Sequence, residues 1–203
     1  EWGFLARQWR YQTGKTITTP PIATGRVVNF ASLDNSLYCI TAGSPRLQWQ
    51  SETDSPVSAP VTYHQGFLYV ACEDFNLYCL NAENGNARWQ PFPSGFPIRT
   101  APRVIGRQVF IFPDAGGLFA ISAQTGKRTW WRQGVRHYVG ASHERIYASD
   151  RVGNIVILRR TDGGVLGTMP LRQFGVKYAN PRTDRLFLAT NSGLLVAIRE
   201  AGA

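Results

Sequence analysis

The chain has 203 residues, of which 43% are hydrophobic and 17% charged, a balance typical of a globular protein with a buried core. It contains no run of about 18 apolar residues, which excludes a membrane-spanning helix, and it shows no signal peptide, although one could have been removed ahead of Glu1. The net charge of +9 lies entirely in residues 101–203, which favours an acidic partner, although an arginine-rich composition explains the excess equally well.

The strongest signal in the sequence is a repeat of about 40 residues. Segment 77–79 (Leu-Tyr-Cys) reproduces segment 37–39, and Trp89 reproduces Trp49. No stretch has the spacing of apolar residues that marks a helix, and the 20 glycines and 12 prolines favour short strands and turns. The sequence therefore predicts an all-β protein built from repeated sheets.

Each repeat is predicted to begin with a short strand and to continue with its most hydrophobic one. These second strands are expected at residues 27–30, 67–70, 109–112, 146–148 and 186–188. A tight turn leads to the third strands, which are expected at residues 37–40, 77–80, 118–121, 155–158 and 195–198. Asp34, Asp74 and Asp114 stand at equivalent places in that turn, which indicates an Asx-type turn and not a catalytic role.

The fourth strands reveal a mismatch between the two ends of the chain. They carry Trp49, Trp89 and Trp130, while Gly167 stands at the tryptophan position of the fourth repeat. A fifth repeat has no fourth strand after it, yet Trp9 precedes Trp49 by the repeat length. Four-stranded antiparallel repeats of this length suit propeller blades.

We therefore predict one domain over residues 1–203, a closed five-bladed β-propeller in which residues 2–11 complete the last blade. The expected blades span residues 16–51, 56–91, 97–132, 134–168 and 175–200. The alternative is an open fragment of a larger propeller.

Residues 120–130 (AISAQTGKRTW) resemble the tryptophan-docking motif A-x-D-x-x-T-G-K-x-x-W, with Ser122 in the place of Asp. Residues 79–89 match it more loosely. The chain thus resembles the PQQ-like β-propeller repeat family, as in BamB-type outer-membrane assembly lipoproteins. That resemblance implies a location outside the cytoplasm and a structural role for Trp9, Trp49, Trp89 and Trp130, whose rings would pack between blades.

The resemblance also bears on cofactors. In the quinoprotein dehydrogenases of this family, the quinone lies in an eight-bladed ring with calcium and a pair of adjacent cysteines. This chain has no such pair and no evident acidic cluster, so PQQ and Ca²⁺ are not expected. Non-catalytic members of the family act as scaffolds that dock proteins.

Catalytic and metal signatures are weak elsewhere in the sequence. The cysteines Cys39, Cys72 and Cys79 have no metal-binding spacing. They are interpreted as buried apolar side chains, although a strained Cys72–Cys79 disulfide stays open. His64, His137 and His143 also lack ligand spacing, so no metal site is predicted.

One polar set would face the channel of a closed propeller. Because strand side chains alternate, the residue after the apolar residue that opens each first strand points the other way. A ring rich in hydrogen-bond donors would bind an anion, and the alternative is a solvated channel mouth. The ring comprises Thr18, Ser58, Arg99, Arg136 and Lys177, with His137, Tyr138 and Tyr178 at its rim.

A second candidate surface is the segment 90–97, where Phe92 and Phe96 lie among prolines. It is interpreted either as a partner-docking loop or as a plug over the ring.

The favoured function is a non-catalytic binding scaffold for a protein, an acidic small molecule or a polysaccharide. Peripheral membrane association is compatible with the basic half, and nucleic acid is disfavoured because the aromatic residues are periodic. The alternative functions are an enzyme with its site at the propeller axis, which includes a divergent quinoprotein, and a structural domain of a larger assembly.

Overall fold

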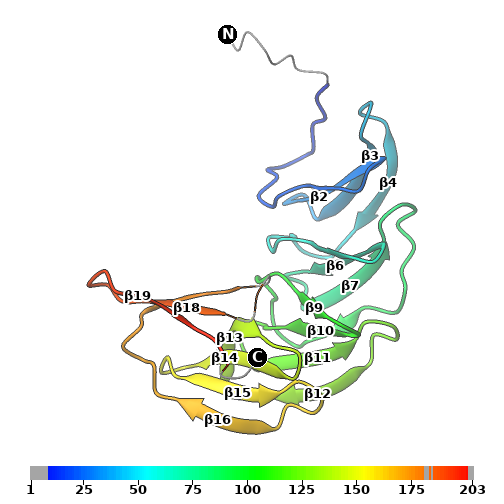
Figure 1. The fold of residues 1–203 in the computed structure, drawn as a ribbon. Helices are drawn as coiled ribbons and strands as arrows, with labels where there is room; N and C mark the ends of the chain where they lie inside the picture. Colours follow the sequence, from blue (N-terminus) through cyan, green and yellow to red (C-terminus); the bar gives the residue numbers. More distant parts are fainter. Residues whose placement is uncertain (1–8, 181–182, 184, 201–203) are drawn as a thin grey trace. The chain divides into compact units, whose positions relative to one another are not determined.

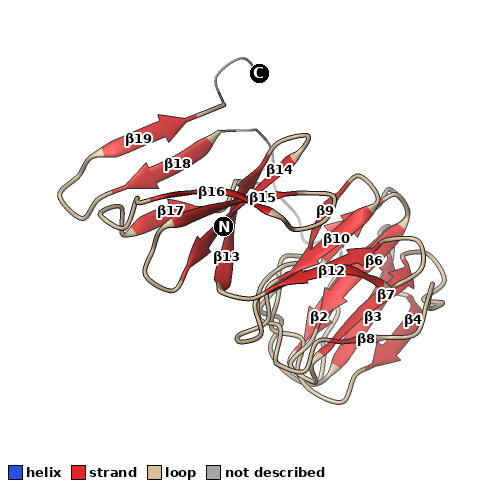
Figure 2. Cartoon of the chain, turned by 90° about the horizontal axis from the view of Figure 1, so that it is seen from below, coloured by secondary structure: helices blue, strands red, loops and turns tan. Residues whose placement is uncertain are grey.

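The computed structural model describes residues 9–180, 183 and 185–200. Strands and turns make up this part of the chain, and no helix occurs in it (Figure 2). The chain divides into two compact units, residues 1–104 with 124–126 and residues 105–123 with 127–203. Each antiparallel sheet is called a blade (Figure 1).

The first unit contains two four-stranded blades. Blade one has the order β1-β2-β3-β4 and comprises β1 (Ile22–Ala23), β2 (Val27–Ser32), β3 (Ser36–Thr41) and β4 (Leu47–Glu52). Blade two has the order β5-β6-β7-β8 and comprises β5 (Thr62–His64), β6 (Phe67–Ala71), β7 (Asn76–Asn81) and β8 (Phe92–Pro93).

The second unit begins within β9 and contains blades three to five. Blade three comprises β9 (Arg103–Ile105), β10 (Gln108–Ile111), β11 (Leu118–Ser122) and β12 (Arg128–Arg132). Blade four comprises β13 (Val135–Ala141), β14 (Arg145–Asp150), β15 (Ile155–Arg159) and β16 (Val165–Met169). Blade five has three strands, β17 (Val176–Tyr178), β18 (Leu186–Ala189) and β19 (Leu195–Ile198).

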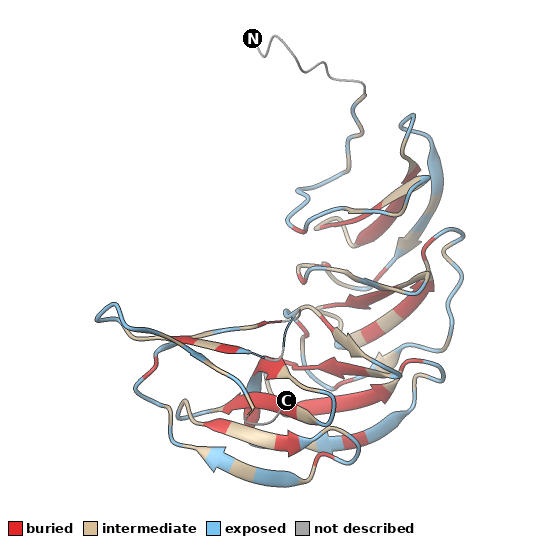
Figure 3. Ribbon diagram, in the orientation of Figure 1, coloured by how far each residue is buried: buried red, intermediate tan, exposed pale blue. Residues whose placement is uncertain are grey.

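The structure confirms the predicted all-β class, and every predicted second and third strand coincides with a strand, except that Phe112 lies one residue beyond the end of β10. The register of β2 on β3 pairs Phe30 with Tyr38, and that of β6 on β7 pairs Val70 with Tyr78, the same step one repeat later. Figure 3 shows that buried residues concentrate in these inner strands, while β4 and β16 are largely exposed. In blades one to four the repeated hydrophobic segments thus coincide with the most buried strands, whereas β19 of blade five is largely exposed.

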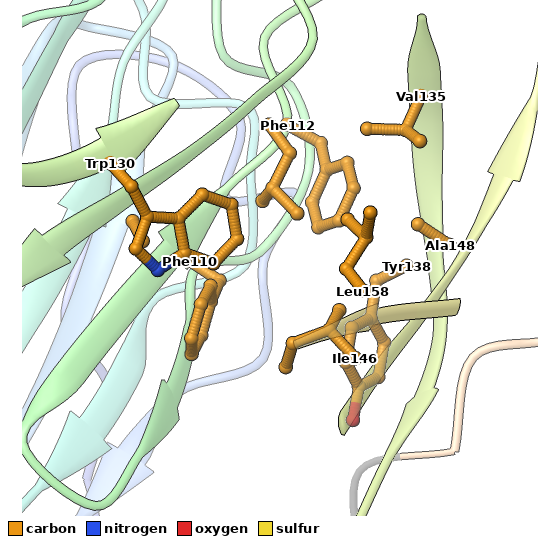
Figure 4. Packing of buried hydrophobic residues seen from close by; sticks show 10 residues of the cluster. Phe110, Phe112, Trp130, Val135, Tyr138, Ile146, Ala148 and Leu158 are labelled. Atoms are coloured by element: carbon orange, nitrogen blue, oxygen red, sulfur yellow. The ribbon is translucent and has the colours of Figure 1, made fainter. Parts of the chain in front are cut away.

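The core of the second unit lies between neighbouring blades. Figure 4 shows Phe110, Phe112 and Trp130 of blade three facing Tyr138, Ile146 and Leu158 of blade four. In the first unit an equivalent cluster joins Leu37 of blade one to Leu68, Val70 and Leu80 of blade two. Burial of such aromatic and aliphatic side chains contributes about 1.5–3 kcal/mol each, so contacts between blades supply much of the stability.

Two of the three repeated turn aspartates, Asp34 and Asp74, form hydrogen bonds within or beside their turns. Asp34 accepts a hydrogen bond from the hydroxyl of Tyr38 at 2.8 Å, and Asp74 accepts one from Tyr78 at 2.6 Å. Asp74 also accepts a hydrogen bond from the backbone N–H of Asn76, which closes an Asx turn. Burial and the bond to Asp74 raise the pKa of Tyr78, so this hydroxyl stays protonated.

The first and fourth strands depart from the prediction. Trp89 was expected within the fourth strand of blade two, but it lies outside any strand, and that edge consists of a single bridge at Ala87 and the short β8. Pro91 and Pro93 lack the N–H that a ladder requires, which accounts for the interruption.

In the first strand of blade five the predicted alternation is wrong. Val176, expected to point into the core, is 55% exposed, while Lys177, expected to point away from it, is half-buried.

The predicted closing segment is only partly covered by the described residues. Residues 2–8 lie outside them, and residues 9–11 form no strand. In the described part of the chain, blade five therefore has three strands, and β19 pairs only with β18.

Candidate functional site

Three tryptophans make the same contact with the blade that follows them. The indole N–H of Trp9 donates to the carbonyl of Ala42 at 3.0 Å, and that of Trp49 donates to Ala82 at 3.4 Å, 40 residues further on at both ends. In the second unit Trp130 donates to Arg160 at 2.9 Å. Trp9 also packs against the cluster of Phe30, Tyr38 and Ile40 on blade one.

Glycines in the turns of the following blades provide the flat surfaces on which these rings lie. A Cβ added to Gly85 would come within 2.8 Å of the Trp49 ring, and one added to Gly126 would come within 2.6 Å of Trp89. Both glycines have positive φ, 73° and 71°, which a residue with a side chain adopts only with strain. Gly163 meets Trp130 in the same way.

Two of the three candidate ring residues of the first unit, Ser58 and Arg99, bind an acidic residue that the sequence did not single out. Glu73 accepts a hydrogen bond from the hydroxyl of Ser58 and forms an ion pair with Arg99 at 2.8 Å. These two bonds hold the pKa of Glu73 below its usual value. The third residue, Thr18, is exposed. Val57 and Ile98, which precede Ser58 and Arg99, are buried, whereas Ile17, which precedes Thr18, is 42% exposed.

The ring residues of the second unit have different surroundings. Arg136 is exposed next to buried Val135, as the alternation predicts. Lys177 is half-buried, its amino group donates to the carbonyl of Phe174, and burial lowers its pKa. The anion ring stays a prediction.

The proposed rim is divided between core and surface. Tyr138 is a core residue, because it is 9% exposed and its hydroxyl donates to the carbonyl of Asn180 at 3.2 Å. His137 is exposed on the same strand, β13, and Tyr178 is exposed on β17, where its ring forms an edge-to-face pair with Phe187. Among the rim residues, only His137 and Tyr178 are accessible to a ligand.

The proposed docking loop proves to be partly a strand. Phe92 lies in β8, pairs with Leu77 and is half-buried. Phe96 is exposed, and a second phenylalanine, Phe75, is exposed in the turn between β6 and β7. Ser94 connects the two segments. Its N–H donates to the carbonyl of Phe75 at 2.8 Å, and its hydroxyl donates to the carbonyl of Phe96 at 2.7 Å.

The second unit contains a hollow of about 480 Å³ with a polar lining. The turn 113–117 between β10 and β11 forms one side of it, and Gln133, Gly134, Val135, Arg136 and Arg151 complete the lining. A second hollow of about 430 Å³ at the other end of blade four is lined by Arg145, Arg159 and Arg160 among others. Each of these three arginines has a protein partner: Glu200, Asp162 and the carbonyl of His143, respectively.

Other predictions concern thiols, metals and the membrane. Cys39, Cys72 and Cys79 are free and buried, as predicted, and burial raises the pKa of Cys39 and Cys72 to about 11. The residues that the structure describes include no cluster of three His, Cys, Asp or Glu side chains suited to a metal. None of their segments forms a helix long and apolar enough to cross a membrane.

Solved structures share this fold at low sequence identity. BamB from Moraxella catarrhalis superposes with a TM-score of 0.70 and 16% identity, over 92% of this chain and 63% of that chain. The computationally designed Ika8 protein gives a TM-score of 0.70 at 10% identity, over 89% of this chain and 57% of that one. The quinohemoprotein alcohol dehydrogenase ADHIIG from Pseudomonas putida HK5 gives 0.67 at 16% identity, over 94% and 41%. The chain thus spans less than two thirds of the length of these three proteins.

The sequence comparisons separate the family from individual relatives. No curated protein sequence matches the chain significantly. Residues 33–175 match the family model described as outer membrane protein assembly factor BamB. Since this match extends from the turn of blade one to the end of blade four, the chain belongs to the BamB family of propeller proteins built from PQQ-like repeats.

Proposed function

We propose that this protein is a docking scaffold that holds another protein during outer-membrane assembly, outside the cytoplasm. The observation that carries the proposal is the match of residues 33–175 to a family described as an outer membrane protein assembly factor. A scaffold requires accessible side chains on a rigid base, and the repeated blades supply such a base.

The surface best suited to docking is the pair Phe75 and Phe96 on blade two. Both side chains are more than two-fifths exposed, although apolar rings are usually buried. Phe75 has a φ of 74°, an uncommon value for a residue with a side chain, and Ser94 bonds the backbone on which both rings are carried. Two aromatic anchors held in fixed positions fit the recognition of an apolar segment of a protein partner.

A photo-crosslinking experiment in the native host tests this proposal. The photoreactive residue p-benzoylphenylalanine is placed at position 75 or 96, and at position 63 as a control, because Tyr63 is equally exposed on the same blade. We expect positions 75 and 96 to capture a protein component of outer-membrane assembly, identified by mass spectrometry, and position 63 to capture none. The absence of such an adduct at 75 and 96, or the same adducts at 63, would contradict the proposal.

We also propose that five blades close into a ring, with residues 2–11 as the fourth strand of blade five. The hydrogen bond from Trp9 to Ala42 supports this register, because it repeats the contact that the fourth strand of blade one makes through Trp49. Blade five supports closure too. Val176, Ala189 and Leu195 form one row across its three strands, and Val176 and Leu195 are exposed apolar residues that further packing would cover.

A further inference from the structure

The polar hollow of the second unit lies where two turns and the start of one strand meet. The turn 113–117 follows β10, Arg136 is the second residue of β13, and Arg151 follows β14. Its volume of about 480 Å³ falls within the range of roughly 300–1,000 Å³ usual for small-molecule sites. Blades three and four both contribute to it, so it belongs to the packed body of this unit.

Two guanidinium groups in its lining have no protein partner in the described part of the chain. Within the residues that the structure describes, neither Arg136 nor Arg151 forms a hydrogen bond or an ion pair through its side chain. The second hollow on blade four differs in this respect, because Arg145, Arg159 and Arg160 are all engaged there. Like charges that line one hollow repel each other unless an anion lies between them.

The turn 113–117, which lines the hollow together with these arginines, contains two adjacent glycines. Gly116 and Gly117 have φ values of 92° and 93°, and a Cβ on Gly117 would overlap the backbone of Arg132. The carbonyl of Gly116 accepts a hydrogen bond from the indole of Trp131 at 2.6 Å. Because the two groups of a trans peptide point in opposite directions, the N–H of Gly117 points away from that indole. Side-chain-free turns of this kind let a ligand approach backbone donors closely.

We propose that this hollow binds a small oxyanion, the carboxylate or phosphate group of a low-molecular-weight ligand, through Arg136 and Arg151. Planar guanidinium groups match the two oxygens of a carboxylate or phosphate, and charge-assisted bonds of this kind are the strongest that a partly exposed site offers. Asp114 is the one acidic residue of the lining, so the charged side chains sum to a net positive charge. The inference shares Arg136 with the predicted ring but requires neither ring closure nor the docking surface on blade two.

Titration with two probes at constant ionic strength tests the site. Inorganic phosphate and citrate are titrated into the whole protein by calorimetry, with sodium chloride to balance ionic strength. We expect saturable binding, and the tighter of the two probes identifies phosphate or carboxylate as the preferred group. The double variant Arg136→Ala/Arg151→Ala should bind that probe at least about tenfold more weakly, since each lost guanidinium removes charge-assisted hydrogen bonds.

Matched variants separate a site from a general charge effect. Arg128→Ala removes the same charge from an exposed position on β12 that does not line the hollow, and it should bind the probe as the unaltered protein does. Asp114→Asn should strengthen binding, because it removes the negative charge of the lining. If the alanine double variant fails to fold, Arg136→Gln/Arg151→Gln takes its place. No saturable binding of either probe, or equal losses in the Arg128 and double variants, would overturn the proposal.

Discussion

At Gly126 the Trp89 ring leaves no room for a side chain, and this contact can be weighed against a matched glycine. Gly25 has the same φ of 71°, but no atom lies within 4 Å of the position that its Cβ would take. Gly25→Ala should therefore cost only the left-handed backbone strain of about 1–2 kcal/mol. Gly126→Ala should cost about 1–3 kcal/mol more, because the methyl group displaces the indole.

Urea unfolding of the two variants measures the difference in the free energy of unfolding. Equal losses at Gly126 and Gly25 would show that the packing of the tryptophan ring contributes nothing beyond the backbone conformation. The comparison therefore isolates the contact between ring and turn that recurs at Gly85 and Gly163.

The Glu73 carboxylate gives the folded state a pH dependence. Its pKa is lowered in the folded protein by the bonds from Ser58 and Arg99, so its contribution to stability is present above the ordinary pKa of about 4.3. That contribution is lost as the pH falls through the lowered value. The free energy of unfolding lost in Glu73→Gln should thus be larger at pH 7 than at pH 3.

Glu52→Gln provides the control for that prediction, because Glu52 is exposed on β4 and does not belong to this cluster. Chemical unfolding at both pH values yields the change in the free energy of unfolding for each of the two variants. If the effect of Glu73→Gln were the same at pH 3 as at pH 7, the ionised carboxylate would not be the stabilising group.

Among the elements, the contact between blade four and blade five shows which residue packs where the repeat lacks its tryptophan. Gly167 stands at the tryptophan position of β16, and Phe174 packs instead against Tyr147, Leu186 and Leu188. Phe174→Ala should destabilise blade five by about 3 kcal/mol, since it leaves a cavity between the two blades. Val176→Ala should change stability by no more than about 0.5 kcal/mol, because Val176 is exposed.

Hydrogen exchange of the β18 amides reports on the packing of blade five locally, because these amides are protected only while blade five is intact. Protection should fall in Phe174→Ala and persist in Val176→Ala. If protection fell in Val176→Ala and persisted in Phe174→Ala, Val176 would be the buried residue, as the repeat predicted.

The predictability of the elements follows from their burial. The second and third strands of blades one to four are mostly buried, so their continuous apolar runs were found at the correct positions, whereas β19 of blade five was found although Leu195 is exposed. The outer strands are half-exposed, and their hydrogen bonds depend on local features such as Pro91 and Pro93, which the 40-residue period does not encode. The first strands were placed too early in blades one to three, because Thr18, Ser58 and Arg99 precede β1, β5 and β9.

Candidate site residues were harder to predict, since their partners come from other repeats. Glu73 was missed because its neighbour Asp74 explained the turn, while its own contacts reach Ser58 and Arg99. Phe75 has no aromatic equivalent at Asn35, so the period concealed it. Arg151 lines a hollow with Arg136 through the pairing of β13 and β14, which a sequence repeat cannot specify.

For the whole molecule, the proposed closure predicts a specific covalent link. If residues 2–11 pair with β19 as β4 pairs with β3, the pairing of Tyr38 with Gln50 places Arg10 opposite Val196. Arg10→Cys/Val196→Cys should therefore form an intramolecular disulfide under mild oxidation, since opposite strand positions bring Cβ atoms within about 4.5–5.5 Å.

Non-reducing electrophoresis and mass spectrometry detect this link. Arg10→Cys/Arg172→Cys is the control, because Arg172 lies in the connection before β17 and outside the expected pairing. Disulfide-linked dimers of the first variant, or no link at all, would contradict closure by this segment.

The indole contacts described above also make the molecule its own optical probe. Trp130 is 7% exposed and bonded to the next blade, whereas Trp131 beside it is 42% exposed. Water that reaches a buried indole shifts its fluorescence emission to longer wavelengths, so parting of blades three and four should redden the spectrum chiefly through Trp130. A Trp131→Phe variant would keep that signal and remove the emission of an exposed indole beside it.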